Sequence, residues 1–199
     1  LSTLFLKTLK DSEIKSGVGE MLKVHAIAGA ESFSKIALKY EELFSDAEMM
    51  MEAIYNSLTI KKSYIEKDEF DRGPRLVFNY GHSFGHAIES ATQFKIPHGI
   101  AVSIGCDMAN FCAMRLGISN KQIFESMHTT FGANYKEYKN VEIPFETFLS
   151  ALGKDKKNTG KNSFSLIFPN QEGKILKDHY QNNENLRKIF KVYLNDLKK

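Results

Sequence analysis

Residues 75–98 read RLVFNYGHSFGHAIESATQFKIPH and hold three of the six histidines of this 199-residue chain. His82 and His86 are four residues apart, and this spacing places two side chains on the same face of an α-helix. His98 comes directly after Pro97, at the expected start of the next helix. The stretch therefore predicts two successive helices that present imidazoles to a common site.

Imidazoles in such a cluster are common ligands of zinc and similar metals. A catalytic zinc site typically has three protein ligands and an open fourth position, and two histidines with one carboxylate satisfy that pattern. The spacing leaves the carboxylate open among Glu20, Glu89 and Asp107. It also leaves open an interpretation without a metal, in which the histidines are hydrogen-bonded core or surface residues. The other histidines lie apart from the cluster and are interpreted as structural or exposed residues: His25, His128 and His179.

Most of the chain has the apolar periodicity of α-helices. Ser12 is the expected N-cap of the first long helix, and Ser45 with Glu48 forms a capping box before the second. The elements expected are helices at about 12–28, 45–67, 79–93, 98–116 and 144–152, a short helix after Ser119, a strand at 163–168 and a C-terminal helix. No alternation of strands and helices and no glycine-rich phosphate turn is visible. The sequence therefore predicts one mainly α, multihelical domain over residues 1–199 with a minor β element.

Composition and charge indicate an ordinary globular protein. Hydrophobic residues make up 42% of the chain and charged residues 26%, and no apolar run approaches the ~18 residues of a membrane-spanning helix. The formal net charge of +3 comes from dispersed lysines and arginines, which argues against nucleic acid as a partner. The spacing of Cys106 and Cys112 fits neither a zinc pair nor a disulfide framework. We therefore expect buried free thiols in a reducing compartment, the cytoplasm.

Five blocks of sequence resemble the dehydroquinate synthases and related sugar phosphate cyclases, and they occur in the order of that family. The signature is N-Y-G-H-S-F-G-H-A-I-E at 79–89. The other blocks are 4–23 with an E-x-x-K pair, 61–75 with D-E-x-D-x-G-x-R, 97–105 with P-H-G-x-A-V-x-x-G, and D-K-K at 155–157 before the strand. Together they cover about residues 1–170. The resemblance implies the C-terminal domain of such an enzyme, without the N-terminal NAD-binding domain and without the true start of the protein.

The resemblance also implies which residues bind the cofactors, carried over position by position. It makes Glu20, His82 and His98 the ligands of a divalent metal, zinc or cobalt. The positions that match the family's contacts with the edge of a bound NAD are Thr8, Leu9 and Glu13.

The substrate-binding residues follow from the same comparison. The catalytic positions that it implies are Lys23, Lys61, Arg75, Asn79, His86 and Lys156. Of these, Lys61 and Arg75 would hold a substrate carboxylate, which suits two cations and the bidentate geometry of arginine. Lys156 would reach the phosphate, and a neutral His86 beside it would relay a proton. Taken alone, each lysine is more simply interpreted as an ordinary surface residue, and the ordered match reverses that preference.

The activity implied is that of 3-dehydroquinate synthase, a carbon–oxygen lyase of the shikimate pathway of aromatic amino acid biosynthesis. It converts 3-deoxy-arabino-heptulosonate 7-phosphate to 3-dehydroquinate and phosphate with bound NAD, and the full-length protein is expected to be a homodimer. We expect the isolated chain to be inactive. Residues that depart from the usual pattern leave the exact sugar phosphate open: His25, Asp71, Pro74, Tyr80, Ser83 and Ile100.

Four alternatives remain at this point. A related cyclase would act on another sugar phosphate, and a metal-dependent, NAD-linked polyol dehydrogenase would also use a metal with histidines on helices. A non-catalytic module would hold a structural metal, which is usually closed by four residues that often include cysteine. A helical interaction domain would bind no metal.

Overall fold

The computed structural model describes residues 1–154 and 163–196. These residues form eight α-helices and a two-stranded antiparallel hairpin, so the predicted mainly α fold with a minor β element is confirmed. The α-helices are α1 (Asp11–Ala28), α2 (Ala30–Leu38), α3 (Ala47–Ile65), α4 (His82–Ala91), α5 (His98–Arg115), α6 (Lys121–Asn134), α7 (Phe145–Gly153) and α8 (Glu184–Asp196). The other elements are the strands β1 (Ser163–Pro169) and β2 (Ile175–Gln181) and the 3-10 helices η1 (Leu4–Thr8), η2 (Glu42–Phe44), η3 (Pro74–Asn79) and η4 (Lys136–Tyr138).

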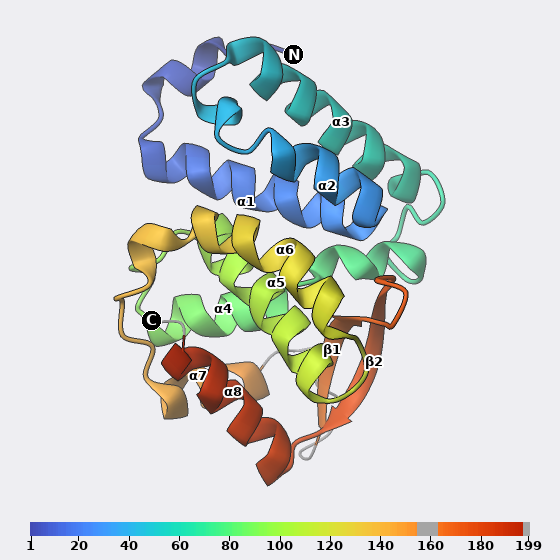
Figure 1. Ribbon diagram of the computed structural model, residues 1–199, viewed down its shortest axis with the longest axis vertical. Helices are drawn as coiled ribbons and strands as arrows, with labels where there is room; N and C mark the ends of the chain where they lie inside the picture. The colour runs from blue at the N-terminus through green and yellow to red at the C-terminus, as the bar shows by residue number, and fades with distance from the viewer. Residues whose placement is uncertain (155–162, 197–199) are drawn as a thin grey trace.

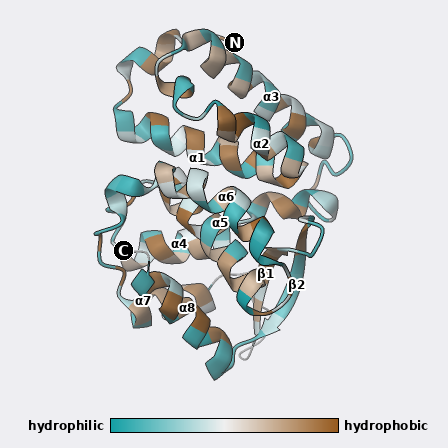
Figure 2. Ribbon diagram, viewed as in Figure 1, coloured by the Kyte–Doolittle hydropathy of each residue, from teal (hydrophilic) through white to brown (hydrophobic). Residues whose placement is uncertain are grey.

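Helix α5 lies at the centre of the molecule. Figure 1 shows α1–α3 at one end, α4–α6 in the middle, and α7, α8 and the hairpin at the other end. Nearly every residue of α5 is buried, and the helix packs against α1, α4, α6, α8 and β1. A helix that is apolar all round must be covered on every side. Helices α1 and α3 instead carry both hydrophobic and hydrophilic residues (Figure 2).

The start of α3 differs from the sequence prediction by one residue. The N-cap is Asp46, whose Oδ1 accepts hydrogen bonds from the backbone N–H groups of Glu48 at 2.8 Å and Met49 at 3.1 Å. The capping box predicted for Ser45 is therefore wrong. Ser45 instead ends the short helix η2, because its N–H donates to the carbonyl of Glu42.

Two other predicted N-caps are wrong by one or two residues. Ser12 lies inside α1, where Lys10 is the N-cap and its N–H donates to the Glu13 carboxylate at 2.8 Å. The N-cap of α6 is Asn120 rather than Ser119, and α6 is a helix of 14 residues instead of a short one. Serine and asparagine have similar capping preferences, so sequence alone does not decide between neighbours.

The helix predicted from residue 79 begins at His82 instead. Gly81 has a φ of 75° and separates η3 from α4, because this left-handed conformation cannot continue a helix. A Cβ at Gly81 would overlap the Sγ of Cys106 on α5. The result is that His82 is the first residue of α4, the helix that packs against the central α5.

Helix α2 and strand β2 were not expected from the sequence. In β2 only Ile175 is buried, so the strand lacks the alternation that identifies a half-buried strand. It forms because it pairs antiparallel with the buried β1 after a turn at Gly173, which has a φ of 78°. The pairing runs from Ser163 opposite Gln181 to Pro169 opposite Ile175.

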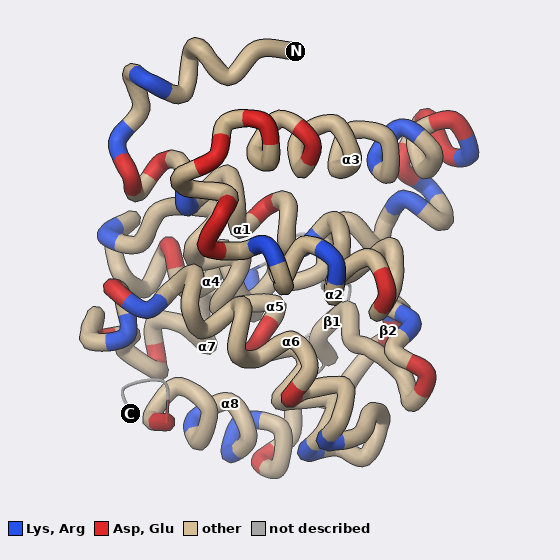
Figure 3. The backbone as a smooth tube through the Cα atoms, turned by 45° about the horizontal axis from the view of Figure 1, so that its top comes forward, with Lys and Arg blue, Asp and Glu red and all other residues tan. Residues whose placement is uncertain are grey.

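The structure also bears on three expectations drawn from the composition, which concern the cysteines, the charged residues and membrane-spanning helices. Both cysteines are buried free thiols, as predicted. Lysines, arginines and acidic residues are spread over many of the elements (Figure 3). Within the described residues, no helix has the length and apolarity needed to cross a bilayer.

Candidate metal and substrate site

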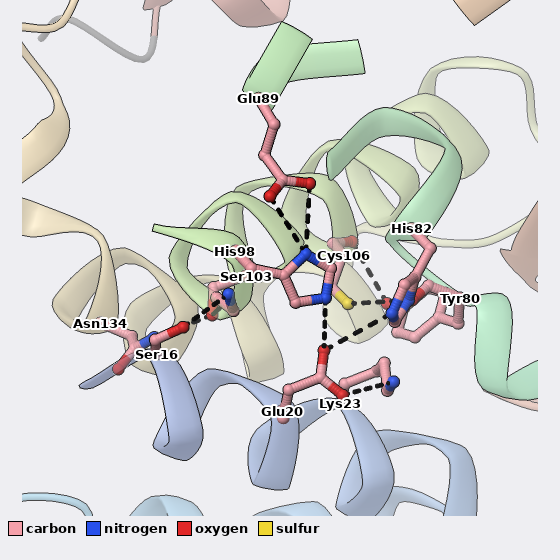
Figure 4. Close-up of polar contacts among 11 residues, drawn as sticks. Ser16, Glu20, Lys23, Tyr80, His82, Glu89, His98, Ser103, Cys106 and Asn134 are labelled. Carbon is pink, nitrogen blue, oxygen red and sulfur yellow. Dashed lines mark hydrogen bonds and ion pairs between the residues drawn. The ribbon is translucent and has the colours of Figure 1, made fainter. Parts of the chain in front are cut away.

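Three side chains from three helices converge at the junction of α1, α4 and α5 (Figure 4). Glu20 lies on α1, while His82 and His98 are the first residues of α4 and α5. Glu20 Oε1 is 3.6 Å from His82 Nε2 and 3.7 Å from His98 Nε2. The fold therefore brings together the three residues that the family resemblance implies as metal ligands.

The far nitrogen of each imidazole is held by a hydrogen-bond acceptor. His98 Nδ1 lies 3.2 Å from both oxygens of Glu89, and His82 Nδ1 lies 3.3 Å from the backbone oxygen of Tyr80. A carboxylate and a carbonyl only accept, so in a neutral ring the proton lies on Nδ1 and Nε2 keeps its lone pair. This is the arrangement in which histidines bind metals in proteins, with the non-ligating nitrogen fixed by an acceptor.

Glu20 has one oxygen that no described residue satisfies. Its Oε2 accepts a hydrogen bond from Lys23 Nζ at 2.8 Å, whereas Oε1 is buried and has no hydrogen-bond partner among the described residues. A buried carboxylate oxygen without a partner is costly. Two ligand atoms that share a tetrahedral zinc at about 2.0–2.2 Å would lie roughly 3.4 Å apart, close to the separations found. The residues present therefore fit a divalent cation.

The protonation states also suit metal ligation, which needs a neutral imidazole and an ionised carboxylate. Burial, together with the nearby ammonium of Lys23, lowers the pKa of His82 to about 4. For Glu20 burial is the largest influence and acts to raise the pKa. The charge and hydrogen bond of Lys23, with smaller effects of the two histidines, outweigh it and leave the pKa below its usual value.

His86 borders the same cluster from an exposed position. Its ring centroid is 5.4 Å from that of His82 and 5.6 Å from that of His98, and one nitrogen of each ring lies within 4.8 Å of the others. The three histidines are thus a second possible ligand set. The buried, unsatisfied oxygen of Glu20 favours the set that includes the carboxylate and leaves His86 at the open side.

The two other carboxylates that the spacing left open have different surroundings. Glu89 contacts the Nδ1 of His98, on the side of the ring away from Glu20. Asp107 is fully buried and accepts hydrogen bonds from His128 Nδ1 at 2.9 Å and from two tyrosine hydroxyls. Among the three, Glu20 is the one that presents an unpaired oxygen to both Nε2 atoms.

Glycines adjoin all three of these side chains and allow the helices to approach closely. A Cβ at Gly19, next to Glu20, would overlap the backbone oxygen of Gly99, next to His98. Gly81 precedes His82. A Cβ at Gly105 of α5 would overlap the carbonyl oxygen of Gly81. Their role was not recognised from the sequence, because a glycine inside a helix identifies a close contact only once the neighbouring helix is known.

Of the predicted substrate residues on α1 and η3, Lys23 contacts the cluster through Glu20. Lys23 is 4% exposed, and its Nζ lies 6.0 Å from the centre of the Phe78 ring. Asn79 ends η3 and donates to the carbonyl of Leu76 at 3.1 Å. The Phe78 ring is 5.1 Å from that of Tyr64, and this contact joins η3 to α3.

The predicted carboxylate-binding residues lie on α3 and at the start of η3. Lys61 is exposed on the last turns of α3. Arg75 is half-buried, and its Nη1 donates to the carbonyl of Glu69 at 2.8 Å. The carboxylate of Asp68 accepts the N–H of Arg75 at 3.1 Å and those of two preceding residues. Lys156 lies outside the described residues.

The predicted NAD-contacting residues lie at the start of α1. Glu13 is about two turns, or roughly 10 Å, before Glu20 on the helix. Leu9 and Glu13 line a hollow of about 220 Å³ between η1, α1 and α3. Thr8 is exposed, and its hydroxyl donates to the carbonyl of Phe5 at 2.9 Å.

Two departures from the family pattern are explained by packing. Tyr80 is fully buried, and its hydroxyl donates to the side-chain oxygen of Asn110 at 2.5 Å and lies 3.2 Å from the carbonyl of Cys106. Ile100 is also fully buried on α5. Both side chains therefore belong to the core around α5.

The chain is similar in sequence to curated 3-dehydroquinate synthases. The family model "3-dehydroquinate synthase C-terminal" matches residues 17–158. The 3-dehydroquinate synthase of Sulfurisphaera tokodaii is 32% identical over 176 residues, which are 85% of this chain and 49% of that protein. That of Campylobacter jejuni subsp. doylei is 35% identical over 183 residues, 87% of this chain and 51% of that protein. The chain thus spans about half the length of these curated relatives.

Solved structures of sugar phosphate cyclases share the fold. The 2-epi-5-epi-valiolone synthase of Streptomyces hygroscopicus subsp. jinggangensis 5008, with NAD⁺ and Zn²⁺ bound, has a TM-score of 0.76 at 17% identity and covers 97% of this chain and 53% of its own. A 2-deoxy-scyllo-inosose synthase with carbaglucose-6-phosphate, NAD⁺ and Co²⁺ has a TM-score of 0.74 at 16% identity, over 93% of this chain and 53% of its own. At such identities the likeness shows the fold alone. The family match, which covers most of the chain, establishes that this chain belongs to the 3-dehydroquinate synthase family, as a C-terminal domain of that type.

Proposed function

We propose that this chain is the metal- and substrate-binding half of a 3-dehydroquinate synthase. The whole enzyme would convert 3-deoxy-arabino-heptulosonate 7-phosphate to 3-dehydroquinate and phosphate, with Glu20, His82 and His98 as the metal ligands. The observation that carries the proposal is the buried Oε1 of Glu20, which lacks a hydrogen-bond partner among the described residues and faces two imidazole nitrogens 3.6 and 3.7 Å away.

The donor set of one carboxylate and two imidazoles suits zinc or cobalt. When bound, such a metal acts as a Lewis acid that polarises a substrate hydroxyl or carbonyl oxygen. Glu89 and the Tyr80 carbonyl hold the histidines so that both Nε2 atoms face the site. Relatives of the same fold support the choice of metal, because their structures contain Zn²⁺ and Co²⁺.

The site also suits an anionic substrate. His82 and His98 are the first residues of their helices, so the N-termini of α4 and α5 both adjoin the site. The unpaired N–H groups and partial positive charge of a helix N-terminus favour phosphate and carboxylate. Lys23 adds a buried ammonium that is already held by Glu20 at 2.8 Å, and we assign it with Asn79 to substrate binding.

Arg75 and Lys61 are assigned to the substrate carboxylate. One nitrogen of the Arg75 guanidinium is held by the Glu69 carbonyl, which fixes the plane of the group. The remaining donors of a guanidinium can bind a carboxylate in bidentate fashion. Two cationic side chains suit a substrate that carries a carboxylate. This pair therefore favours a keto-acid phosphate over a sugar phosphate that has no carboxylate.

The remaining assignments concern proton transfer and the second half of the enzyme. His86, at the open side of the cluster, would exchange a proton with the leaving phosphate, and Lys156 would bind that phosphate. NAD supplies reversible hydride transfer when bound, and Thr8, Leu9 and Glu13 would contact its edge. We expect a dimer of the full-length protein in the cytoplasm.

Metal binding by the chain tests the site directly. The chain is stripped with a chelator and titrated with Co²⁺, whose visible spectrum reports coordination by histidine and carboxylate. We expect one Co²⁺ per chain, and loss of tight binding in the variants Glu20→Ala, His82→Ala and His98→Ala. His86→Ala and the distant His128→Ala are controls that should keep it. Loss in His86→Ala with retention in Glu20→Ala would identify the three-histidine set instead.

The reaction is tested in the complete protein, with its nucleotide-binding half. A dehydroquinate synthase releases phosphate from the seven-carbon substrate without net accumulation of NADH, because the hydride is returned. A polyol dehydrogenase accumulates NADH and releases no phosphate. Arg75→Ala should weaken binding of the substrate and leave Co²⁺ binding unchanged, and loss of the metal in this variant would contradict its assigned role.

A further inference from the structure

The first turn of α5 is capped by a residue of α1. Pro97, the N-cap of α5, makes no side-chain capping bond. The N–H of Gly99, one of the unpaired donors of the first turn, instead donates to the hydroxyl of Ser16 at 2.7 Å, across 83 residues of sequence. A helix-start N–H that is buried needs such an acceptor. Ser16 thus performs for α5 the role of an N-cap side chain (Figure 4).

This bond lies next to two of the proposed metal ligands. Gly99 directly follows His98, and Ser16 is one helical turn before Glu20, so the two face the same way from α1. The Ser16–Gly99 bond and the 3.7 Å approach of Glu20 to His98 are therefore neighbouring contacts across one helix crossing.

The crossing itself is a contact of backbones. A Cβ at Gly99 would overlap the carbonyl of Ser16, and a Cβ at Gly19 would overlap the carbonyl of Gly99. Because neither Gly19 nor Gly99 carries a side chain, the two backbones approach closely here, and the nearest side-chain atoms include the small hydroxyls of Ser16 and Ser103. A directional hydrogen bond adds a constraint on how the two helices slide or rotate.

The opposite side of the same turn is also fixed. Ser103 donates to the carbonyl of Gly99 at 3.0 Å and accepts from Asn134 of α6 at 2.8 Å. Tyr40 in turn donates to Asn134 at 3.1 Å. The first turn of α5 is thus anchored to α6, and Ser16 connects this anchored turn to α1.

We infer that Ser16 is a positioning residue for the metal: it caps α5 from α1 and holds Glu20 and His98 at the separation that a shared cation requires. This inference rests on the proposed function, because Ser16 would have no ligands to position without a metal. Ser16 touches neither metal nor substrate, so its effect is on the affinity for the cation rather than on the chemistry.

The test compares Co²⁺ affinity in Ser16→Ala, Ser16→Thr and Ser57→Ala. Ser57 is a matched control, a buried serine whose hydroxyl donates within its own helix to the Ala53 carbonyl at 2.8 Å. Removing a partner that orients a metal ligand typically lowers affinity roughly tenfold to a hundredfold. We expect that loss in Ser16→Ala, with an altered Co²⁺ spectrum, while Ser16→Thr and Ser57→Ala bind as the wild type does.

Hydrogen exchange of the Gly99 amide in the metal-free chain provides a second measurement. Exchange should be slow in the wild type and in Ser57→Ala and markedly faster in Ser16→Ala, at a temperature where all three are folded. Wild-type Co²⁺ affinity in Ser16→Ala would overturn the role of Ser16 and leave the metal centre standing. A wild-type chain that binds no Co²⁺ would overturn the proposed metal centre and the inference with it.

Discussion

Asp68 shows how one side chain can determine where a distant functional group lies. Its two carboxylate oxygens accept the backbone N–H groups of Arg72, Gly73 and Arg75 at 2.8–3.1 Å. These bonds, that of Arg72 first, hold the pKa of Asp68 below its usual value. The carboxylate therefore folds the chain between α3 and η3 around itself and sets the start of the segment that carries Arg75.

Replacement of Asp68 by alanine should therefore reduce substrate binding through Arg75. A displacement of about 1 Å in a positioning group can cost up to a hundredfold in rate. In the complete enzyme we expect a rise in KM of roughly tenfold or more, with Co²⁺ affinity unchanged. The KM of Asp68→Asn, which keeps one acceptor oxygen, should lie between those of the wild type and Asp68→Ala. Equal KM values for Asp68→Ala and the wild type would contradict this role.

His128 is a residue away from the metal site whose protonation should affect the stability of the fold near neutral pH. Its hydrogen bond to the buried Asp107 raises its pKa above the usual value, against burial and the charge of Lys139. A raised folded-state pKa means that this stabilisation is complete below the unfolded value of about 6.5 and is lost as pH rises through the folded pKa.

We therefore expect the urea midpoint of the wild-type chain, measured relative to that of His128→Gln, to fall from about pH 6 upward through the raised pKa. His179→Gln is a control, because His179 is exposed on β2. Parallel pH profiles for the wild type and His128→Gln would show that the Asp107–His128 contact contributes no such dependence.

At the scale of elements, the approach of α1 to α5 depends on Gly19. A methyl group there would overlap the Gly99 carbonyl and the Ser103 hydroxyl, whereas a methyl group at Gly17 of the same helix meets nothing within 4 Å. Overpacking of a tight contact typically costs about 1–3 kcal/mol. The same substitution at an open helical glycine gains about 0.5–1 kcal/mol, because alanine loses less backbone entropy.

Gly19→Ala should therefore lower the free energy of unfolding and the Co²⁺ affinity together, since the helices that carry Glu20 and His98 must move apart. Gly17→Ala should leave the affinity unchanged and keep or increase the stability. Urea unfolding of the metal-free chain and Co²⁺ titration measure the two quantities. Tight Co²⁺ binding in a folded Gly19→Ala chain would contradict this account of the helix crossing.

The sequence predicted the helices around the histidines well, and it did so for a physical reason. The pairs His82–His86 and Pro97–His98 are local signals, and local spacing determines which face of a helix a side chain occupies. The cap at Asp46 and the strand β2 were missed, because both depend on competition between neighbours or on pairing with a distant segment.

The residues of the candidate site were likewise only partly predictable from local sequence. The histidines could be found from spacing, but the choice of Glu20 over Glu89 and Asp107 required either the family resemblance or the fold. The choice depends on which oxygen remains unpaired after α1, α4 and α5 have packed. The contact between Ser16 and Gly99 joins residues 83 positions apart, and no local pattern predicts it.

At the scale of the whole molecule, the chain carries the proposed metal site but spans only about half the length of its relatives. We predict that the isolated chain binds Co²⁺ yet neither binds NAD tightly nor converts the substrate. Calorimetric titration measures NAD binding, and a phosphate-release assay measures turnover. A polypeptide that also contains the nucleotide-binding half should both bind NAD and convert the substrate. Turnover by the 199-residue chain alone would contradict the prediction.

The origin of the three converging side chains has a mechanical consequence. Glu20 belongs to the α1–α3 end of the molecule, whereas His82 and His98 belong to the middle helices. An ion held by all three would act as a cross-link between these two parts, and its binding energy would add to the resistance of the fold against heat. Chelation should then loosen the α1–α3 end first, so that proteases cut there before they reach the buried helix α5.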